Sequence, residues 1–381
     1  MVDVTVYDIL EQLEQERKTM KSRYRKVTAL LLLTAILGGC AAREEYTGGQ
    51  VTAEVPEVTA EQAKLNMIQP NAYNNVNGLD LEPGSYISIL GRSGSGAYWE
   101  EIKKGMNQAV EDINTLLEYE GSDKVKATYN AADTPDNVDE QVNILDEELA
   151  RYPVAVGIAL SDASACEVQF DLAAENGIPV VAFDSGSDYQ GLMSTVSTDN
   201  DAAAREAASR MAEDMEDTGS VLILVDNSKA KAEMVRESAF RDEMQSQHPG
   251  ITIAETCYLD QLETTDPDTD PMEAFLAQYP DITGIFAVSS DAVSCALELS
   301  DAMDTDPVIV GFDAEEDEIS ALSEGQISGL IVQNPYGMGY ASVVAAARAA
   351  LGQGNEAVVN TGYLWVDAQN LKTEEVQRIL Y

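Results

Sequence analysis

The sequence predicts an α/β fold with parallel sheets covered by helices, and three observations carry this prediction. From Ser85 onward, short apolar runs alternate with amphipathic segments almost without interruption, which is typical of parallel sheets with helices on both faces. The chain has 381 residues, whereas one domain usually has about 100–200, so we expect two domains. Polar clusters follow several apolar runs, at the strand ends where open α/β sheets bind ligands.

Short apolar runs are expected to be strands, and the periodic segments between them helices. The expected strands are Tyr86–Leu90, Val125–Tyr129, Val154–Ile158, Val180–Phe183, Val221–Val225, Ile251–Tyr258, Gly284–Val288, Val308–Phe312 and Leu330–Gln333. After a first helix that begins near Ala97, the expected helices include Asn137–Leu149, Cys166–Glu175, Asp201–Met215, Lys231–Gln247, Ala292–Ser300 and Met338–Leu351.

The stretch Tyr86–Gly105, YISILGRSGSGAYWEEIKKG, joins the first strand to that helix through a flexible turn. Trp99 stands where a dinucleotide fingerprint needs its third glycine, and the Gly-Lys-Ser/Thr triplet of a P-loop does not occur in this turn. Ser93 is followed two positions later by Ser95, where a nucleophile elbow requires glycine. The turn therefore indicates neither phosphate cradling nor serine hydrolysis.

Polar residues follow four of the expected strands: Ser161-Asp162, Asp184-Ser185-Gly186, Ser289-Ser290-Asp291 and Asp313. Each has a purely structural interpretation, because Ser290 and Asp291 could cap a helix and Asp184 and Asp313 could belong to turns. Their recurrence at successive strand ends instead favours a common cleft.

The N-terminal region has the pattern of a secretory signal. Four basic residues within 21–26 precede the apolar run Val27–Leu37, which is shorter than the ~20 residues of a membrane span, and small residues follow. Leu37-Gly38-Gly39-Cys40 resembles the bacterial lipobox, which implies cleavage before Cys40 and lipidation of its sulfur. We expect a signal peptide over 1–40; residues 1–19 are either a misassigned start before Met20 or a short helical extension.

Residues 41–83 are rich in polar residues without periodicity and are expected to form a flexible tether. The net charge of -44 argues against binding to nucleic acid or to anionic membrane surfaces. Beside Cys40 there are three cysteines, Cys166, Cys257 and Cys295, whose spacing fits no zinc motif. We expect buried thiols.

Taken together and in order, eight segments resemble a type I periplasmic binding protein of the ribose- and galactose-binding branch. They are SILGRSGSGAYW, GIALSDA, VVAFDSGSD, TVSTDN, AEMVRESAF, IFAVSSDAV, IVGFDAEED and GLIVQNPYGMGY. The resemblance covers Ser85 to about Val366. It implies two Rossmann-like lobes with parallel sheets, joined by three crossover segments, with a sugar held between the lobes.

The resemblance also implies a division of the chain. Lobe one is expected to comprise 85–197 and 335–361, and lobe two 198–334 and 362–381. The expected crossings are Thr198–Asn200, a segment near Tyr258-Leu259, and Gln333-Asn334.

In that family, aromatic rings stack on the sugar, and carboxylates, amides and an arginine bind its hydroxyls. Carried onto this sequence, the ligand-binding residues would be Ser95, Tyr98, Trp99, Asp184, Arg236, Ser290, Asp313 and Gln333. The chemistry is consistent with a polyol, because hydrogen bonds to charged groups contribute about 1.5–3 kcal/mol and an aromatic face suits ring C–H groups. Two structural alternatives are a surface salt bridge of Arg236 with Glu233 or Glu237, and core packing by Tyr98 and Trp99.

Three positions depart from the ribose binders. Ser185 stands where they carry a second arginine, Ala159 where they carry an asparagine, and Gln261 or a neighbour where a second stacking aromatic is expected. The resemblance therefore implies a sugar or related polyol without implying ribose.

Metal and catalytic sites have little support. Asp266, Asp268 and Asp270 have the spacing of an EF-hand start, but Pro271 stands where that loop needs glycine. His248 is the only histidine, which leaves Ser-His-Asp catalysis unsupported. We expect no metal and no cofactor.

These observations lead to one preferred function and several alternatives. We expect a monomeric, lipid-anchored extracytoplasmic solute-binding protein, not an enzyme, that delivers a sugar or polyol to the permease of an ABC importer. The alternative is a ligand-sensing receptor subunit that signals to a membrane kinase or chemoreceptor. A LacI-type repressor shares this fold, but it would need a basic helix-turn-helix where Val27–Cys40 stands.

Overall fold

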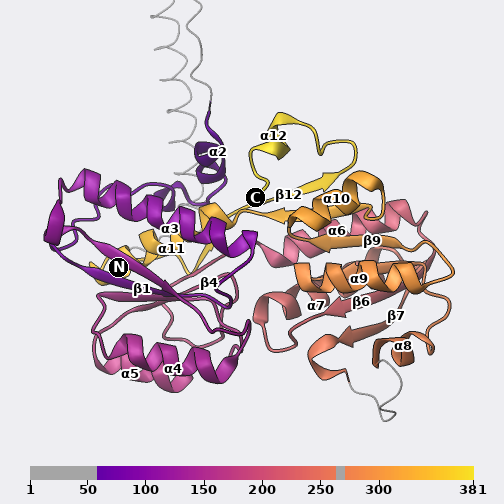
Figure 1. The fold of residues 1–381 in the computed structure, drawn as a ribbon, viewed down its shortest axis with the longest axis horizontal. Helices are drawn as coiled ribbons and strands as arrows, with labels where there is room; N and C mark the ends of the chain where they lie inside the picture. Colours follow the sequence, from indigo (N-terminus) through magenta and orange to yellow (C-terminus); the bar gives the residue numbers. More distant parts are fainter. Residues whose placement is uncertain (1–57, 263–270) are drawn as a thin grey trace, which may run out of the picture. The chain divides into compact units, whose positions relative to one another are not determined.

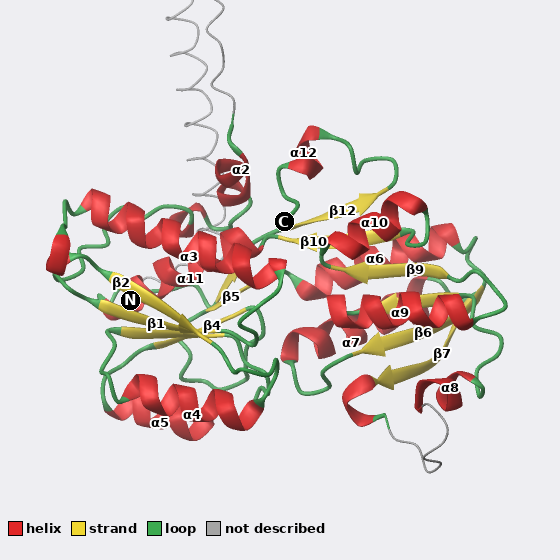
Figure 2. Cartoon of the chain, viewed as in Figure 1, coloured by secondary structure: helices red, strands yellow, loops and turns green. Residues whose placement is uncertain are grey.

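A computed structural model describes residues 58–262 and 271–381. The predicted signal segment with Cys40, residues 41–57 of the predicted tether and the acidic run Asp266–Asp270 lie outside the described residues. Two six-stranded sheets organise the described part (Figures 1 and 2), which confirms the predicted α/β class. None of the helices within 58–262 and 271–381 combines the length and the apolar character needed to span a bilayer.

The first sheet, with its helices, forms lobe one. Its strand order is β11-β5-β4-β3-β1-β2, and all its pairs are parallel. Its strands are β1 (Tyr86–Leu90), β2 (Lys126–Asn130), β3 (Ala155–Ile158), β4 (Val180–Phe183), β5 (Thr195–Ser197) and β11 (Val358–Asn360). Helices α3 (Ala97–Leu116) and α11 (Pro335–Ala350) cover one face, and α4 (Val138–Leu149) and α5 (Glu167–Glu175) cover the other (Figure 1).

The second sheet forms lobe two, in the order β12-β10-β9-β8-β6-β7. Its strands are β6 (Gly219–Val225), β7 (Ile251–Tyr258), β8 (Gly284–Ala287), β9 (Val308–Phe312), β10 (Gly329–Gln333) and β12 (Tyr363–Asp367), of which β12 runs antiparallel to β10. The helices of this lobe are α6 (Asn200–Asp214), α7 (Lys231–Gln247), α8 (Pro271–Leu276), α9 (Ser290–Ala302), α10 (Glu316–Glu324) and α12 (Glu374–Gln377).

Alternation along β6 shows why helices cover both faces of this sheet. Leu222 and Leu224 pack in the core with α9 and α10, whereas Val221, Ile223 and Val225 pack in the core with α6 and α7. Successive side chains of a strand point to opposite faces, so a continuous apolar run needs a helical layer on each side.

Four strands, β1, β4, β7 and β9, have the bounds expected from the sequence. The sequence analysis missed β5, β11 and β12. Two of these have only three residues each, which is too short for a periodic signal. The third, YLWVD, is stabilised by its pairing with β10.

Three segments carry the chain between the sheets. Thr198-Asp199 joins β5 to α6, Asn334 joins β10 to α11, and Thr361-Gly362 joins β11 to β12. Two of the segments are hydrogen-bonded, because Asn334 Nδ2 donates to the carbonyl of Thr361 at 2.8 Å. The expected crossing near Tyr258-Leu259 is wrong: β7 and β8 belong to the same sheet, and the short helix η3 (Leu259–Gln261) and α8 lie between them.

The expected tether is also wrong over its described part, 58–83. Helix α2 (Ala60–Asn66) and the short helix η1 (Asn71–Tyr73) lie there. Leu65, Ile68 and Tyr73 are buried in the same core as α3 and α11, and Lys64 pairs with Glu101 of α3 at 2.7 Å. The apolar residues are irregularly spaced, so periodicity could not reveal that this segment packs onto lobe one.

Candidate ligand-binding cleft

A cavity of about 420 Å³ lies between the two lobes, at the carboxyl ends of their strands. All eight residues that the sequence analysis selected line it: Ser95, Tyr98, Trp99, Asp184, Arg236, Ser290, Asp313 and Gln333. The structure thus brings together side chains from the turn after β1, from strand ends of both sheets, from α7 and from the first turns of α3 and α9. Their contact with a ligand stays a prediction.

Two of these residues have an unusual backbone. Asp184 follows β4 with a φ of 56°, and Asp313 follows β9 with a φ of 83°. Residues other than glycine rarely adopt this left-handed region, and such conformations concentrate at functional sites. Both side chains are buried, so the turn interpretation of these aspartates is compatible with a place in the cleft.

The aromatic residues begin α3. Gly96, with a φ of 101°, directly precedes the helix, so Tyr98 and Trp99 lie in its first turn. Their rings meet edge to face with centroids 5.3 Å apart. Tyr98 Oη donates to Asp184 Oδ1 at 2.7 Å; burial and the charge of Asp184 raise the pKa of Tyr98 well above its ordinary value, so its hydroxyl remains a donor. Tyr98 also belongs to the core of lobe one, so it packs in the core as one interpretation expected and lines the cleft as well, while its contact with a ligand stays a prediction.

Arg236 is buried, with 3% of its surface exposed, which overturns the surface salt-bridge interpretation. Its Nε donates to Asn200 at 2.8 Å, Nη1 to the carbonyl of Val288 at 2.8 Å and Nη2 to Gln333 Oε1 at 2.9 Å. The guanidinium lies 4.2 Å from the ring centroid of Phe312. Glu233 and Glu237 instead pair with Arg92 and Arg241.

Hydrogen bonds continue from Arg236 through Gln333 to Asp313. Gln333 Nε2 donates to Asp313 Oδ1 at 2.7 Å, and Tyr381 Oη donates to the same oxygen at 3.0 Å. Burial raises the pKa of Asp313, while Arg236 and these two donors oppose the shift. Both bonds go to Oδ1, and Oδ2 accepts no hydrogen bond from the residues that the structure describes.

Sequence reasoning missed several residues of the cleft. Arg92 forms two bonds with Asp136, at 2.7 and 2.9 Å, and reaches Glu233 of lobe two at 2.9 Å. Glu315 of lobe two accepts from the backbone N–H groups of Ala97 and Tyr98, at 3.3 and 3.1 Å. Arg92 is the only cation of the Gly91–Gly96 turn, and this was the one feature of the sequence that could have indicated a role in the cleft. Its partners are distant in sequence, so local patterns do not reveal them.

The three departures from the ribose binders lie outside the lining. Ser185 is buried, and its Oγ accepts from the backbone N–H of Ala232 at 3.3 Å. Ala159 is buried as well, and Gln261 donates to Ser228 at 2.6 Å. None of these positions supplies an arginine or an aromatic ring to the cleft.

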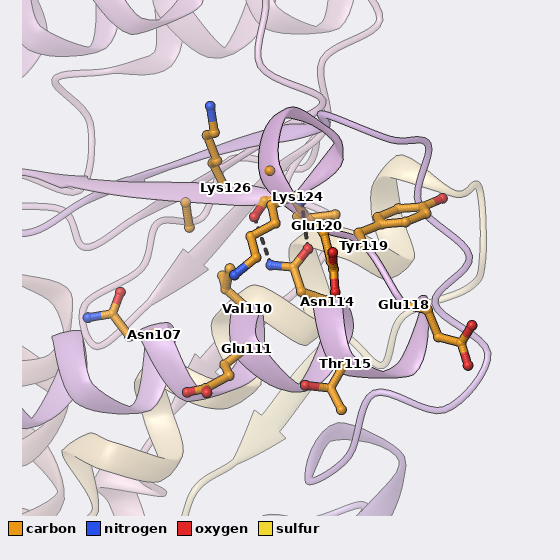
Figure 3. Close-up of a pocket in the computed structure, with 13 residues that line it drawn as sticks. Asn107, Val110, Glu111, Asn114, Thr115, Glu118, Tyr119, Glu120, Lys124 and Lys126 are labelled. Carbon is orange, nitrogen blue, oxygen red and sulfur yellow. Dashed lines mark hydrogen bonds between the residues drawn. The ribbon is translucent and has the colours of Figure 1, made fainter.

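A second cavity, of about 920 Å³, lies between the carboxyl-terminal half of α3 and the first residues of β2 (Figure 3). Asn114, at its wall, donates to the carbonyl of Val125 at 3.0 Å and accepts from its N–H at 2.8 Å. These bonds join helix to strand within lobe one. The cavity is at the amino end of β2, opposite the edge where open α/β sheets bind ligands, so we do not assign the site there.

Other groups considered from the sequence are placed apart from the cleft. His248 pairs with Asp217 at 2.7 Å. Cys166 and Cys257 are buried, which raises the pKa of each thiol to about 12. In the part of the chain that the structure describes, His, Cys, Asp and Glu side chains form no group of three or more arranged to hold a metal ion.

Two lobes joined by three crossings, with a polar and aromatic cleft between them, define a class of ligand-binding proteins. A family model described as a periplasmic binding protein domain matches residues 87–354. The chain therefore belongs to this family, and its architecture is that of type I.

Known relatives agree with this assignment. The chain is 25% identical to the ribose import binding protein of Haemophilus influenzae over 182 residues, 48% of this chain and 61% of that relative, which is less than two thirds of its length. A carbohydrate transporter solute-binding protein of Agrobacterium radiobacter, in complex with D-arabinose, is 26% identical with a TM-score of 0.66. An ABC transporter solute-binding protein of Agrobacterium vitis, bound to α-D-tagatopyranose, is 25% identical with a TM-score of 0.69. Each structural match covers 78% of this chain and 99% of the other. These relatives are solute-binding proteins, not enzymes.

Proposed function

We propose that this protein captures a sugar or related polyol between its lobes and delivers it to an ABC importer. One observation carries the proposal: eight residues selected from the sequence, on both lobes, line a single cavity. The cavity offers carboxylates, an amide, hydroxyls and aromatic rings, which together suit hydroxyl groups and ring C–H groups. The ligands bound in the two similar structures, D-arabinose and α-D-tagatopyranose, support the same class of ligand.

Ligand binding also provides the mechanism by which the two lobes close. A ligand that touches both lobes makes all its contacts only when they close, so it shifts the open–closed equilibrium toward the closed form. Delivery requires that the closed form be recognised by the permease. The proposal includes a monomeric protein held outside the cytoplasm by a lipid on Cys40, which lies outside the described residues.

A binding screen tests the central claim. The full chain, purified in detergent, is mixed with a panel of sugars, polyols and nucleosides, and unfolding temperatures are measured. Compounds that raise the unfolding temperature are then titrated by calorimetry. The proposal expects at least one sugar or polyol to bind with a stoichiometry of one, and binding by nucleosides alone would contradict it.

Labelling tests the anchor separately. Cells that express the wild type or Cys40→Ala are fed radiolabelled palmitate, and the immunoprecipitated protein is examined. The label should appear in the wild type and be absent from Cys40→Ala, and equal labelling of both proteins would exclude Cys40 as the lipidated residue.

A further inference from the structure

The lining of the cleft is strongly acidic. It contains two guanidiniums, Arg92 and Arg236, and nine carboxylates. These carboxylates are Asp136, Asp184, Asp226, Glu233, Asp291, Asp313, Glu315, Asp317 and Glu318.

Arg92 lies within ion-pair distance of three of these nine carboxylates. It bonds Asp136 and Glu233, and Asp184 lies 3.9 Å from it. Arg236 donates to Asn200, to a carbonyl and to Gln333, and all three of these acceptors are neutral. The other six carboxylates, all from lobe two, have no lysine or arginine within ion-pair distance among residues 58–262 and 271–381.

Uncharged donors form hydrogen bonds with several of these six carboxylates. Asp226 accepts from the Ser289 hydroxyl, Asp313 Oδ1 from Gln333 and Tyr381, and Glu315 from two backbone N–H groups. Hydrogen bonds of this kind solvate a carboxylate but leave its negative charge in place. The acidic lining therefore retains an excess of negative charge that the described residues do not neutralise.

Glu318 is the clearest case. It is 2% exposed and lines the cavity. Its Oε2 accepts from the N–H of Glu315 at 2.8 Å, and the nearby Ser290 hydroxyl lowers the pKa of this carboxyl. Oε1 is buried with no hydrogen-bond partner in the described part of the chain. Leaving a buried polar group without a partner is unfavourable, and more so for a charged one, so Oε1 lacks a donor at the wall of the candidate cleft.

Burial and repulsion between neighbouring carboxylates raise the pKa of two residues in this lining. Burial, and next the charge of Asp313, raise the pKa of Glu318 to about 8. Burial and the charge of Asp226 raise the pKa of Asp291. Without a ligand, Glu318 is therefore protonated at neutral pH. A positive charge bound beside it would lower its pKa and ionise it, because a nearby cation favours the charged form of a carboxylate. Hydroxyl groups of a neutral sugar could donate to these oxygens without offsetting the charge.

We propose that the ligand is a polyhydroxylated compound with a protonated amino group, such as an amino sugar, and that Asp313 and Glu318 receive its ammonium. This rests on the proposed function and names the chemical class of its ligand. Oδ2 of Asp313 and Oε1 of Glu318 provide two acceptors on one lobe. Tyr98 and Trp99 on the other lobe provide aromatic surface for the ring, which also attracts cations.

Matched pairs of sugars test the inference. The full chain in detergent is titrated by calorimetry with D-glucosamine, D-glucose and N-acetyl-D-glucosamine, and with D-galactosamine, D-galactose and N-acetyl-D-galactosamine, at about pH 6 so that the free amines are protonated. In at least one series, the amino sugar should bind about tenfold or more tightly than the neutral sugar. Acetylation of the amine should remove this preference.

Two substitutions on α10 test whether Glu318 is responsible for the preference for the amino sugar. Glu318→Gln should reduce the preference for the amino sugar about tenfold. Glu324→Gln is the matched control, because Glu324 is on the same helix, exposed and outside the lining, and it should bind like the wild type. Circular dichroism of each variant checks that it is folded.

The outcomes separate the inference from the proposed function. Neutral sugars that bind as tightly as their amino counterparts would overturn the inference and leave the proposed function standing. A preference that Glu318→Gln and Glu324→Gln both retain would overturn the assignment to Glu318. If neither these compounds nor any member of the sugar and polyol panel binds, both proposals fail.

Discussion

The guanidinium of Arg92, in the turn after β1, bonds the carboxylate of Glu233 on α7 at 2.9 Å, beside the cleft and across the two lobes. Glu233 is almost completely buried, and Arg92 is mostly so. Burial and the neighbouring Asp226 raise the pKa of Glu233, and Arg92 opposes the shift. The ion pair therefore compensates a charge that would be costly to bury alone.

Arg92→Ala is expected to destabilise the protein strongly. Removing one partner of a buried ion pair costs about 3–5 kcal/mol, because the other charge is left uncompensated. Urea unfolding followed by circular dichroism measures the loss, and Arg92→Ala/Glu233→Gln should recover part of it. The control is Arg378→Ala, whose pair with the exposed Glu374 should contribute less than about 1 kcal/mol; equal losses in the two single variants would contradict the role given to Arg92.

Ligand-driven closure should change the emission of Trp99. This side chain lines the cleft, so a bound ligand and the approach of lobe two both alter its surroundings. The second tryptophan, Trp365, is on β12 and outside the lining, and Trp365→Phe isolates the signal of Trp99. A saturable shift or quench is expected during titration with the ligand from the screen. Emission that stays constant while calorimetry reports binding would place the ligand elsewhere.

Asp313→Ala should weaken ligand binding while the protein stays folded. If Oδ2 receives a ligand donor, its loss costs about 1.5–3 kcal/mol, or roughly tenfold to a hundredfold in affinity. Titration calorimetry beside circular dichroism measures both properties. Trp99→Ala, which removes an aromatic face from the opposite lobe, should also weaken binding. Wild-type affinity in both folded variants would show that the cleft residues have been assigned incorrectly.

Glu318 should make stability fall as the pH rises. Its carboxyl has a pKa of about 8 in the folded protein, against an ordinary 4.5, so between these values the folded state holds a proton that the unfolded state has released. Stability from this group is therefore greatest below about pH 4.5 and declines until about pH 8. Glu318→Gln removes the decline, so it should be more stable than the wild type at about pH 9 and much closer to it at about pH 5.

Unfolding temperatures of Glu318→Gln, the wild type and Glu324→Gln across this pH range test the assignment. The exposed Glu324 is on the same helix, so its variant should follow the wild-type profile. Parallel profiles for Glu318→Gln and the wild type would contradict the buried, protonated state.

Local patterns determined much of this protein. Continuous apolar runs of four or more residues predict strands because a buried parallel strand needs apolar side chains on both faces, and β4 (VVAF) and β9 (VIVGF) appear at the expected bounds. β1 and β7, whose runs include polar residues, also have the expected bounds. The polar residues after these runs were correctly placed at the carboxyl ends of strands, and the resemblance added Arg236 and Gln333. All eight selected residues consequently line one cavity.

Only the tertiary structure decided the features that depend on contacts between distant segments. Arg92 and Glu233 are 141 positions apart. Tyr381, which follows α12, donates a hydrogen bond to Asp313 after β9. The third crossing, at Thr361-Gly362, joins two strands that are recognised through their pairing with β5 and β10. Packing of Leu65 and Ile68 against lobe one likewise leaves no periodic trace. Periodicity records which face of an element is buried, whereas burial of a charge or an irregular segment depends on the partner that the fold brings to it.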